Sequence, residues 1–543
     1  MRDYADAYST FDLGTARAVL SAGGENGLNA AVECCDRWCG AGRTGLVCAD
    51  EAGNETRLSF EDLKEASSRL ANLLASLGVT AGDRVAGLLP RTPELLVTIL
   101  AVWRLGGIYQ PLFTAFGPKA IEHRVATSGA RAVVTDAGNR DKLSDIAADV
   151  RIIVTDEAAR RIDTDIVMTA ALAEQPAEFA PVTRSLEDPF LMMFTSGTTG
   201  AAKPLLVPLK AIAAFVGYMR DAIDLRPEDR FWNIADPGWA YGLYYGITGP
   251  LAMGQTVYLY KGGFSAESSV AFIKKYGITN LAGSPTAFRL IVAAGPEAVA
   301  PIAGQLRAVS SAGEALNPEV VHWFARHLKA PIYDHYGQTE LGMVVCNHHA
   351  LKHKVTPGSA GFAVPGHRIV VIDEQGNELP PHQPGELAVD IEKSPLYWFR
   401  GYENGGQRPT RYYRSGDIVE LNDDGSISFV GRADDVITSS GYRIGPFEVE
   451  SALIEHDAVV EAAVVGKPDP QRTEIVKAFI ILKPGVKGDD NLVRELQEHV
   501  KKRLSAHSYP REIAFVESLP KTPSGKIQRF ILRAQEKAAA AAC

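Results

Sequence analysis

Over roughly its first 350 residues, the chain alternates between amphipathic helical stretches and short apolar runs. Ser59 to Asp62 has the pattern of a helix-capping box, and apolar residues then recur at helical spacing as far as Gly78. The apolar runs 84–89 and 132–135 follow helical stretches and carry turn residues at their ends. This alternation predicts α/β units that build parallel sheets.

The pattern changes from about Gly361 onward. The runs 367–372 and 385–390 are short strands separated by Gly, Pro and Asp turns, which predicts a small antiparallel unit. After a boundary at Arg432 to Asp435, the chain reads as a compact α+β segment. Its helix is expected to bury Leu492, Leu496, Val500 and Leu504, and the Ala-rich end 537–543 is expected to fray.

Length and composition exclude several classes of protein. A chain of 543 residues exceeds what one hydrophobic core organises, so a single small binding module is excluded. The net charge is −9 and the basic residues are scattered, which argues against nucleic acid as the main partner. We find neither a signal-peptide pattern nor an apolar stretch long enough for a membrane span, and therefore expect a cytoplasmic protein.

The six cysteines fit a reducing compartment. Four of them lie close together in the sequence, but they form no CxxC pair and have no nearby His that would complete a zinc site. We interpret them as small apolar side chains of a partly buried helix.

The strongest local signal is the segment from Phe194 to Lys203, which follows an apolar strand. Its glycines let backbone N–H groups approach an anion, its hydroxyls add donors and its lysine adds charge, which together suit a polyphosphate. The spacing is not that of a Walker A loop, and Leu205 to Val207 reads as a second strand. The loop is therefore expected to join two strands.

Further segments follow in a fixed order along the chain: 311–316, 334–340, 413–417, 431–435 with 441–443, and 520–526. With these segments, the chain resembles the adenylate-forming superfamily of acyl-CoA synthetases, luciferases and peptide-synthetase adenylation domains. The resemblance extends over roughly residues 30 to 535 and is strongest to medium-chain and acetyl-CoA synthetase-like acyl-CoA ligases.

The resemblance implies an α/β fold in two parts. Residues 1–432 would form an N-terminal adenylation domain of two α/β sheet subdomains plus a small β-barrel-like subdomain. Residues 433–543 would form a small mobile α+β C-terminal domain with a catalytic lysine loop and a CoA face.

The resemblance also implies an ATP site. The loop would hold the β- and γ-phosphates, although the Pro and Gly that usually flank its lysine are here Ala202 and Pro204. A flat adenine ring would lie between a small-residue slot and Tyr336, and Asp417 would accept both ribose hydroxyls with help from Arg432. The implied ATP- or AMP-binding residues are Thr195, Ser196, Gly197, Thr198, Thr199, Gly200, Gly313, Glu314, Ala315, Asp334, Tyr336, Gly337, Gln338, Thr339, Asp417 and Arg432.

The implied catalytic residues are Lys526, Thr339, Glu340 and Lys203. Glu340 would bind Mg²⁺ that bridges the phosphates, and Thr339 would bond the α-phosphate. Lys526 would supply positive charge where the acid carboxylate must approach the negatively charged α-phosphate of ATP. The C-terminal domain would then rotate about the hinge residue Asp434 and present Gly441 and Arg443 to CoA.

The implied reaction converts a small carboxylic acid to acyl-AMP with release of pyrophosphate, and then to acyl-CoA. In acetyl-CoA synthetases a bulky Trp at the position of Gly337 closes the acyl pocket, and its absence here is expected to leave space for several methylenes. We therefore expect acids longer than acetate: short- to medium-chain fatty acids, including branched ones. Segment 235–242 resembles the pocket wall of medium-chain enzymes, and Trp239, Tyr241, Gly242 and Gly337 are the predicted acyl-pocket residues. Aryl acids such as benzoate stay open.

Three other classes are considered. A luciferase-like oxygenase would use the same first step, but nothing in the sequence demands that activity. An amino-acid-adenylating enzyme is disfavoured, because no Asp that would hold an α-amino group is evident in the wall 239–245. A catalytically silent nucleotide-binding protein is disfavoured by the presence of Lys526, Glu340 and Asp417. A second copy of the chain in a homodimer, and a lysine acetyltransferase or deacetylase acting on Lys526, are the further partners considered.

Overall fold

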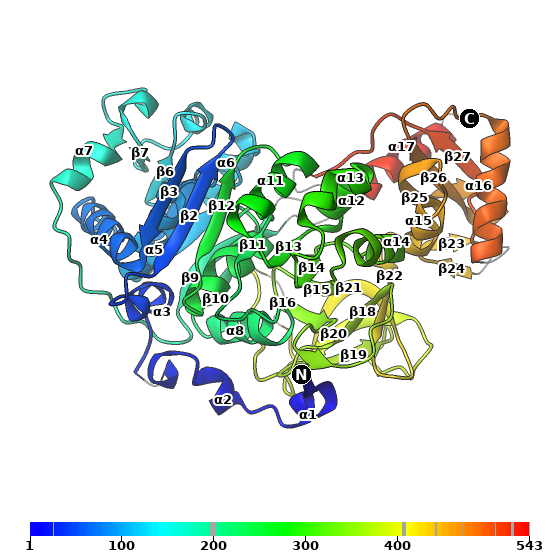
Figure 1. Cartoon of the computed structure of the whole chain (residues 1–543), viewed down its shortest axis with the longest axis horizontal. Coiled ribbons are helices and arrows are strands. Elements are labelled where there is room, and N and C mark those ends of the chain that lie inside the picture. The colour runs from blue at the N-terminus through cyan, green and yellow to red at the C-terminus, as the bar shows by residue number, and fades with distance from the viewer. Residues whose placement is uncertain are drawn as a thin grey trace.

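The fold was analysed in a computed structural model that describes residues 1–24, 26–195, 202–403, 405, 409–439, 442–469, 471–504, 507–522 and 526–541. A large N-terminal part carries sheets of seven, ten, three and two strands, and a smaller C-terminal part, at the right of Figure 1, carries a sheet of five. The predicted α/β class is confirmed.

The seven-stranded sheet has the strand order β10-β9-β5-β4-β6-β7-β8 and is parallel except for the edge pair β9 and β10. Helix α4 (Phe60–Ser76) begins with the predicted capping box, in which Ser59 and Asp62 exchange side-chain to backbone hydrogen bonds. Helix α5 (Pro93–Arg104) packs beside α4. The strands are β4 (Arg84–Leu88), β5 (Ile108–Pro111), β6 (Ala132–Thr135), β7 (Arg151–Val154), β8 (Ile166–Val167), β9 (Pro189–Thr195) and β10 (Lys203–Pro208).

The ten-stranded sheet has the order β11-β13-β14-β15-β16-β18-β22-β21-β20-β19. It is parallel from β11 to β15 and antiparallel from there on, so the predicted small antiparallel unit continues the second α/β sheet. The strands are β11 (Phe231–Asn233), β13 (Asn280–Gly283), β14 (Ala308–Ala312), β15 (Ile332–Gln338), β16 (Gly342–Cys346), β18 (Ser359–Ala363), β19 (Arg368–Ile372), β20 (Gly385–Asp390), β21 (Tyr412–Leu421) and β22 (Ile427–Arg432).

A three-stranded sheet, β12-β2-β3, joins distant parts of the chain. Strand β12 (Val257–Lys261) runs parallel to β2 (Thr44–Asp50), which forms a hairpin with β3 (Glu55–Ser59). The pairing of β2 with β12 was not predicted, because sequence periodicity does not report which strands meet over so long a separation.

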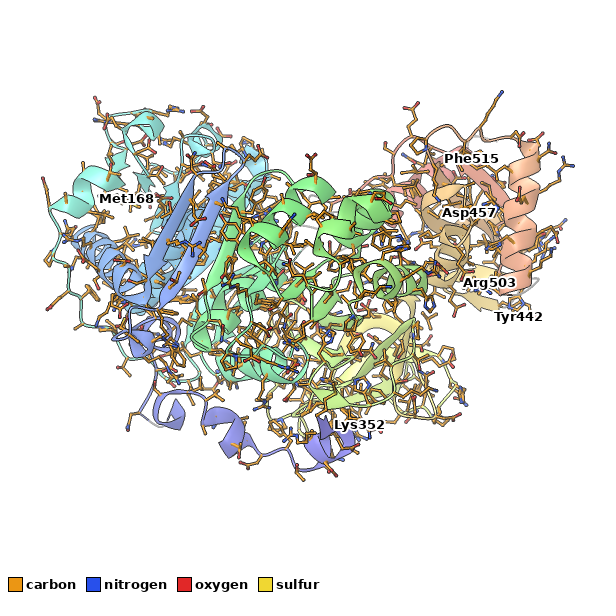
Figure 2. All side chains as sticks on the ribbon, in the orientation of Figure 1. Met168, Lys352, Tyr442, Asp457, Arg503 and Phe515 are labelled. Atoms are coloured by element: carbon orange, nitrogen blue, oxygen red, sulfur yellow. The ribbon has the colours of Figure 1, made fainter. Side chains whose placement is uncertain are left out.

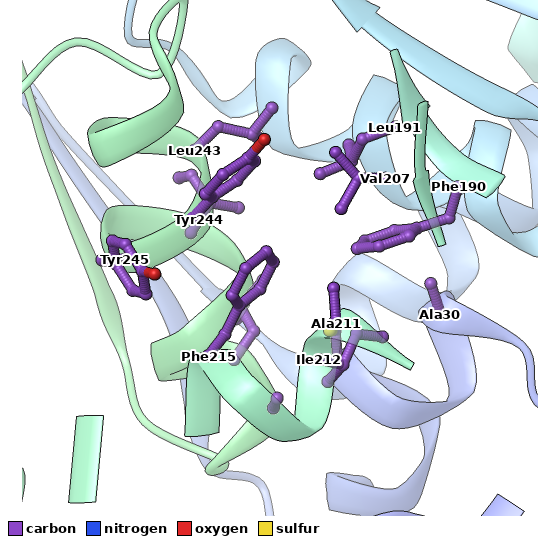
Figure 3. Close-up of a cluster of buried hydrophobic side chains, with 14 of the residues drawn as sticks. Ala30, Phe190, Leu191, Val207, Ala211, Ile212, Phe215, Leu243, Tyr244 and Tyr245 are labelled. Atoms are coloured by element: carbon purple, nitrogen blue, oxygen red, sulfur yellow. The ribbon is translucent and has the colours of Figure 1, made fainter. Parts of the chain in front are cut away.

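The main core lies between the edge of the seven-stranded sheet and helix α8 (Ala211–Asp221) (Figure 3). Phe190 of β9 and Phe215 of α8 are both buried, and Phe215 stacks on Tyr244 with ring centroids 4.6 Å apart. Burying an aromatic side chain of this size contributes about 2 to 3 kcal/mol. This core therefore supports β9 and β10 from one side.

The C-terminal part has its own core. Strands β23 (Ile437–Ser439), β24 (Tyr442–Ile444), β25 (Val459–Asp469), β26 (Thr473–Leu482) and β27 (Glu512–Phe515) form its sheet, with helices α15 (Pro446–Ile454), α16 (Asp490–Arg503) and α17 (Arg529–Ala541). In α16, Leu492, Leu496 and Val500 are buried as predicted. Leu504 was wrongly placed on that face: it follows the helix and is 38% exposed.

The expectation of a frayed end was also wrong for residues 537–541, because α17 is helical as far as Ala541, and residues 542–543 lie outside the described residues. Alanine has the highest helix propensity, so the Ala-rich composition extends the helix.

The predicted division at 432 falls between β22, which ends at Arg432, and β23, which begins at Ile437. Figure 2 shows side chains filling both parts, with Tyr442 at the outer end of the smaller one. Among the described residues, no helix has the length and apolar character needed to cross a bilayer.

Candidate active site

Strands β9 and β10 are antiparallel neighbours, as the interpretation of a loop between two strands predicts. Thr195 ends β9 directly opposite Lys203, which begins β10. The Lys203 ammonium lies 5.2 Å from the ring centroid of Tyr402. The predicted phosphate-loop residues between the two strands, Ser196, Gly197, Thr198, Thr199 and Gly200, lie outside the described residues.

Tyr402 links this edge to Glu340. Its hydroxyl donates a hydrogen bond of 2.6 Å to Glu340 Oε1, and the Glu340 carboxylate is buried. Glu340 and Thr339 lie in the turn between β15 and β16, where the Thr339 carbonyl accepts from Tyr244 at 3.1 Å. Burial and then the charge of Glu340 raise the pKa of Tyr402. The Tyr402 hydroxyl therefore stays protonated and donates the hydrogen bond to Glu340. The sequence analysis missed Tyr402, which lies in none of the recognised segments.

Asp417 forms a second cluster on the neighbouring strands. It is only 4% exposed, and its Oδ2 accepts hydrogen bonds from Tyr336 Oη (2.6 Å) and Gln338 Nε2 (2.8 Å). Arg432 faces it across the β21–β22 pair, with 3.3 Å between the guanidinium and Oδ1. Burial raises the pKa of Asp417, and Arg432 partly opposes that shift. Residues predicted to surround the adenosine therefore meet around one carboxylate.

Lys526 reaches this region from the C-terminal part. A Cβ atom added to Gly313 would lie 3.8 Å from Lys526 Cε, and the positive charge of Lys526 also acts to lower the pKa of Asp417. Its backbone is held by two hydrogen bonds with Thr522, of 2.8 and 3.0 Å. Gly313 has a φ of +104°, a conformation that only glycine adopts easily. Lys526 thus approaches the chain at Gly313, where a residue other than glycine would strain the backbone.

The remaining predicted adenine-site residues are Glu314, Ala315 and Asp334. The Glu314 carboxylate accepts hydrogen bonds from two side chains of helix α12 (Pro285–Ala293), Thr286 and Arg289, each at 3.0 Å. Ala315 follows it and is half-buried. Asp334 Oδ2 accepts from the Leu316 amide at 3.1 Å, whereas Oδ1 has no hydrogen-bond partner among the described residues. Burial raises the pKa of Asp334 to about 8.

The predicted acyl wall is aromatic. The Trp239 ring lies 5.2 Å from that of Phe113 and 5.5 Å from that of Phe116. Tyr241 belongs to a buried cluster, with its hydroxyl 3.2 Å from that of Tyr218. Position 242 requires glycine, because a Cβ atom there would lie 2.2 Å from the carbonyl oxygen of Asp236.

Gly337 does not open the space that we expected. A Cβ at this position would lie 2.1 Å from the Gly342 carbonyl oxygen and 2.7 Å from Met343 Cα. The backbone of the β15–β16 turn therefore fills the direction in which a side chain would point. The expectation that the missing indole directly leaves pocket volume is wrong at this position, and Gly337 is needed for the close approach of two strands.

Known families and solved structures match this arrangement. The model of the family "AMP-binding enzyme" matches residues 35–402, and the model "AMP-binding enzyme C-terminal domain" matches residues 448–526. The chain belongs to the AMP-binding enzyme family.

Two curated relatives of this AMP-binding enzyme align over nearly the whole chain. It is 38% identical to acetyl-coenzyme A synthetase of Bacillus subtilis, over 99% of this chain and 95% of that protein. It is 35% identical to the mitochondrial acyl-coenzyme A synthetase ACSM4 of Rattus norvegicus, over 94% and 90%.

Solved structures agree in fold. An acyl-CoA synthetase of Brucella canis is 58% identical, with a TM-score of 0.81 over 99% of this chain and 100% of that one. An anthranilate CoA ligase in complex with anthranoyl-AMP is 25% identical, with a TM-score of 0.87 over 97% and 99%. The predicted superfamily is confirmed.

The residues of this AMP-binding enzyme suit Mg²⁺ at Glu340. The carboxylate is a hard oxygen donor beside the strands of the phosphate loop, and no group of three or more His, Cys, Asp or Glu side chains among the described residues could hold a metal. Mg²⁺ is commonly held by one or two carboxylates together with substrate phosphates. A single carboxylate at this place fits that mode.

The predicted hinge residue Asp434 lies beside Arg432 of the Asp417 cluster, and the predicted CoA face is described only in part. Asp434 is 3.6 Å from Arg432 and 3.9 Å from Arg533 of α17. Gly441 lies outside the described residues, and Arg443 is described only by its backbone, which pairs with Thr438 of β23.

Proposed function

We propose that this AMP-binding enzyme is an ATP-dependent acid–thiol ligase that converts a short- to medium-chain carboxylic acid, branched acids included, to its acyl-CoA. The observation that carries the proposal is the meeting of Lys526 with Gly313 in the region of the buried carboxylate Asp417. The acyl-coenzyme A synthetase relatives support the same reaction class.

In the first step, a carboxylate oxygen of the acid attacks the α-phosphorus of ATP, the bond to the bridging oxygen breaks, and pyrophosphate leaves. Two anions approach each other in this step, so the fixed ammonium groups of Lys526 and Lys203 lower its barrier electrostatically. Asp417 would hold the ribose hydroxyls and Tyr336 the adenine face, while Thr339 would bond the α-phosphate. Glu340 would hold Mg²⁺, which would supply neutralising charge to the phosphates.

In the second step, the thiolate of CoA attacks the carbonyl carbon of the acyl-adenylate, and AMP leaves with the bonding electrons. Lys526 is not needed there. The C-terminal domain, which we assign to residues 433–543, would turn about Asp434 and bring the strand of Arg443 to the acyl group. Gly441 would leave room for the pantetheine arm.

The acid itself is proposed from the wall around Trp239 and Tyr241. Aromatic rings form an apolar surface that suits hydrocarbon chains, and each buried methylene contributes about 0.8 kcal/mol. An aryl acid is the second candidate, favoured by the packing of Trp239 with Phe113 and Phe116. Similarity to the anthranilate CoA ligase, and to a benzoate CoA ligase of Burkholderia xenovorans at 28% identity, supports that candidate.

The test is pyrophosphate release from MgATP with acetate, butyrate, hexanoate, octanoate, isobutyrate and benzoate, with and without CoA. We expect CoA-dependent turnover with a maximum at an aliphatic acid longer than acetate. A maximum at benzoate would select the aryl ligase. Absence of release with every acid would overturn the ligase and favour a nucleotide-binding protein.

Location and protein partners are part of the proposal. The free cysteines, most of them buried, are compatible with a reducing cytoplasm. Lys526 is exposed, so an acetyltransferase could remove its charge and a deacetylase could restore it. Mass spectrometry that finds acetylated Lys526 with adenylation unimpaired would contradict this regulation. We also propose assembly as a homodimer, which analytical ultracentrifugation would test by measuring the mass of the particle in solution.

A further inference from the structure

The face between the two parts of the molecule carries a cluster of charged side chains, of which only Glu314 belongs to the predicted ATP site. Arg289 of α12 lies at its centre and is only 14% exposed. On its own side Arg289 donates to Glu314 at 3.0 Å, directly after Gly313. On the other side it lies 3.6 Å from Glu461 of β25, whose carboxylate is 9% exposed.

Glu461 connects this arginine to the hairpin that holds Lys526. Its second carboxylate oxygen accepts from Lys521 Nζ at 2.8 Å. Lys521 pairs with Ile527 in an isolated bridge, and the Thr522 amide donates to the Lys526 carbonyl at 2.8 Å. One carboxylate therefore ties the base of the hairpin to the large part of the molecule.

Two further contacts lie beside this chain. Asn317, which accepts from Arg289 at 3.5 Å, donates to Ser451 of α15 at 3.0 Å. Arg529 of α17 binds Glu450 bidentately at 2.7 and 3.0 Å, and the positive charge of Arg289 also reaches Glu450. The cluster pairs three cations with three carboxylates, and Arg289 with Glu461 is the ion pair in it that joins the two parts.

We propose that Glu461 is a positioning residue for the adenylation step, because its contacts with Arg289 and Lys521 hold Lys526 over Gly313. The proposal rests on the function proposed above. Solvent and salt screen an ion pair between side chains that are only 14% and 9% exposed less than they screen an exposed pair, so the contact can bias where the hairpin lies. Since Lys526 acts only in the first step, loss of Glu461 should slow acid activation and spare the transfer to CoA.

The test compares Glu461→Gln with a matched control, Glu512→Gln. Glu512 accepts from Lys467 at 2.7 Å, within the C-terminal part alone. Both half-reactions are measured in the full-length chain: pyrophosphate–ATP exchange with the preferred acid, and thioester formation from supplied acyl-adenylate and CoA. We expect exchange to fall about tenfold in Glu461→Gln, with thioester formation within twofold of the unaltered enzyme and both steps unchanged in Glu512→Gln.

A double-mutant cycle with Arg289→Gln tests the contact itself. If the two residues act together, the double variant should lose little more exchange activity than either single variant. Fully additive losses would mean that the two side chains act independently, which would overturn the proposed contact.

Amide hydrogen exchange at Thr522 gives a readout that needs no turnover. We expect faster exchange there in Glu461→Gln than in the unaltered protein or in Glu512→Gln. Unchanged Thr522 exchange, or equal loss of both half-reactions, would overturn the positioning role. If the unaltered protein gave no pyrophosphate exchange with any acid, the proposed function would fail, while the amide measurement would still decide the role of Glu461.

Discussion

Tyr402 contacts two of the groups that the proposed first step uses. Its ring faces the Lys203 ammonium and its hydroxyl donates to Glu340. Because Glu340 is the proposed Mg²⁺ ligand, the hydroxyl would orient that carboxylate from behind.

We predict that Tyr402→Phe lowers the rate of pyrophosphate–ATP exchange roughly tenfold to a hundredfold and raises the Mg²⁺ concentration needed for half-maximal rate. The ring over Lys203 is kept, so only the hydrogen bond is tested. Tyr412→Phe is the control, because the Tyr412 hydroxyl donates to the glutamate Glu378 at 2.8 Å on an exposed surface. An unchanged Mg²⁺ dependence in Tyr402→Phe would show that the hydroxyl does not orient a metal ligand.

Asp334 makes the stability of the fold depend on pH. Its folded-state pKa, raised to about 8 by burial, lies above the ordinary carboxyl value of about 4. Between these two values the unfolded chain has released a proton that the folded chain retains. The free energy of unfolding therefore decreases as the pH rises through this window.

Asp334→Asn removes that titration, so we predict that it reduces the difference in melting temperature between pH 5 and pH 8 by about 2 °C or more. Differential scanning calorimetry without ligands measures this difference. The control Asp457→Asn alters an exposed carboxylate on the small part (Figure 2) and should leave it unchanged. An equal pH effect in the unaltered protein and in Asp334→Asn would contradict the raised pKa.

At the scale of single elements, α4 depends on its first turn. Ser59 and Asp62 satisfy backbone N–H groups that the helix itself cannot pair. We predict that Ser59→Ala lowers the free energy of unfolding by about 1 kcal/mol in urea titration. Ser76→Ala at the exposed last residue of the same helix should change it by less than about 0.5 kcal/mol. Equal effects of the two substitutions would show that the cap is not what stabilises α4.

Elements whose signal is local could be predicted from the sequence. The capping box of α4, the β9–β10 pair around the phosphate loop and the buried face of α16 all follow from residues close together in the chain. Contacts between distant segments could not be predicted. Tyr402 reaches Glu340 because the backbone after β20 returns to β10, where Glu403 donates to the Pro204 carbonyl at 2.9 Å. At Gly337 the sequence shows a small residue, but only the packed turn shows that backbone atoms fill the space.

At the scale of the whole molecule, the two parts carry separate hydrophobic cores. Val449, Leu453 and Leu496 belong to a cluster that contains only residues of the C-terminal part. The large cluster around Phe190 and Phe215 contains only residues of the N-terminal part. Contacts between the parts include polar ones at Arg289 and Asn317 and a ring contact of Phe429 with Phe447, but among the described residues no buried cluster spans the two parts, so the larger part buries most of its apolar surface without the smaller one.

We therefore predict that a chain ending at Arg432 folds and binds ATP but does not activate acids. Its pyrophosphate–ATP exchange activity should fall by at least about a hundredfold, because it lacks the Lys526 ammonium that would stabilise the approach of the acid carboxylate to the α-phosphate. The full-length Lys526→Ala variant should lose exchange to the same degree yet still form thioester from supplied acyl-adenylate, which the shortened chain should not do.

Calorimetry would measure ATP binding, and assays of the two half-reactions would separate the variants. If the shortened chain retained exchange, the assignment of Lys526 to the first step would be wrong, and if it formed thioester, the CoA face would have to lie in the large part.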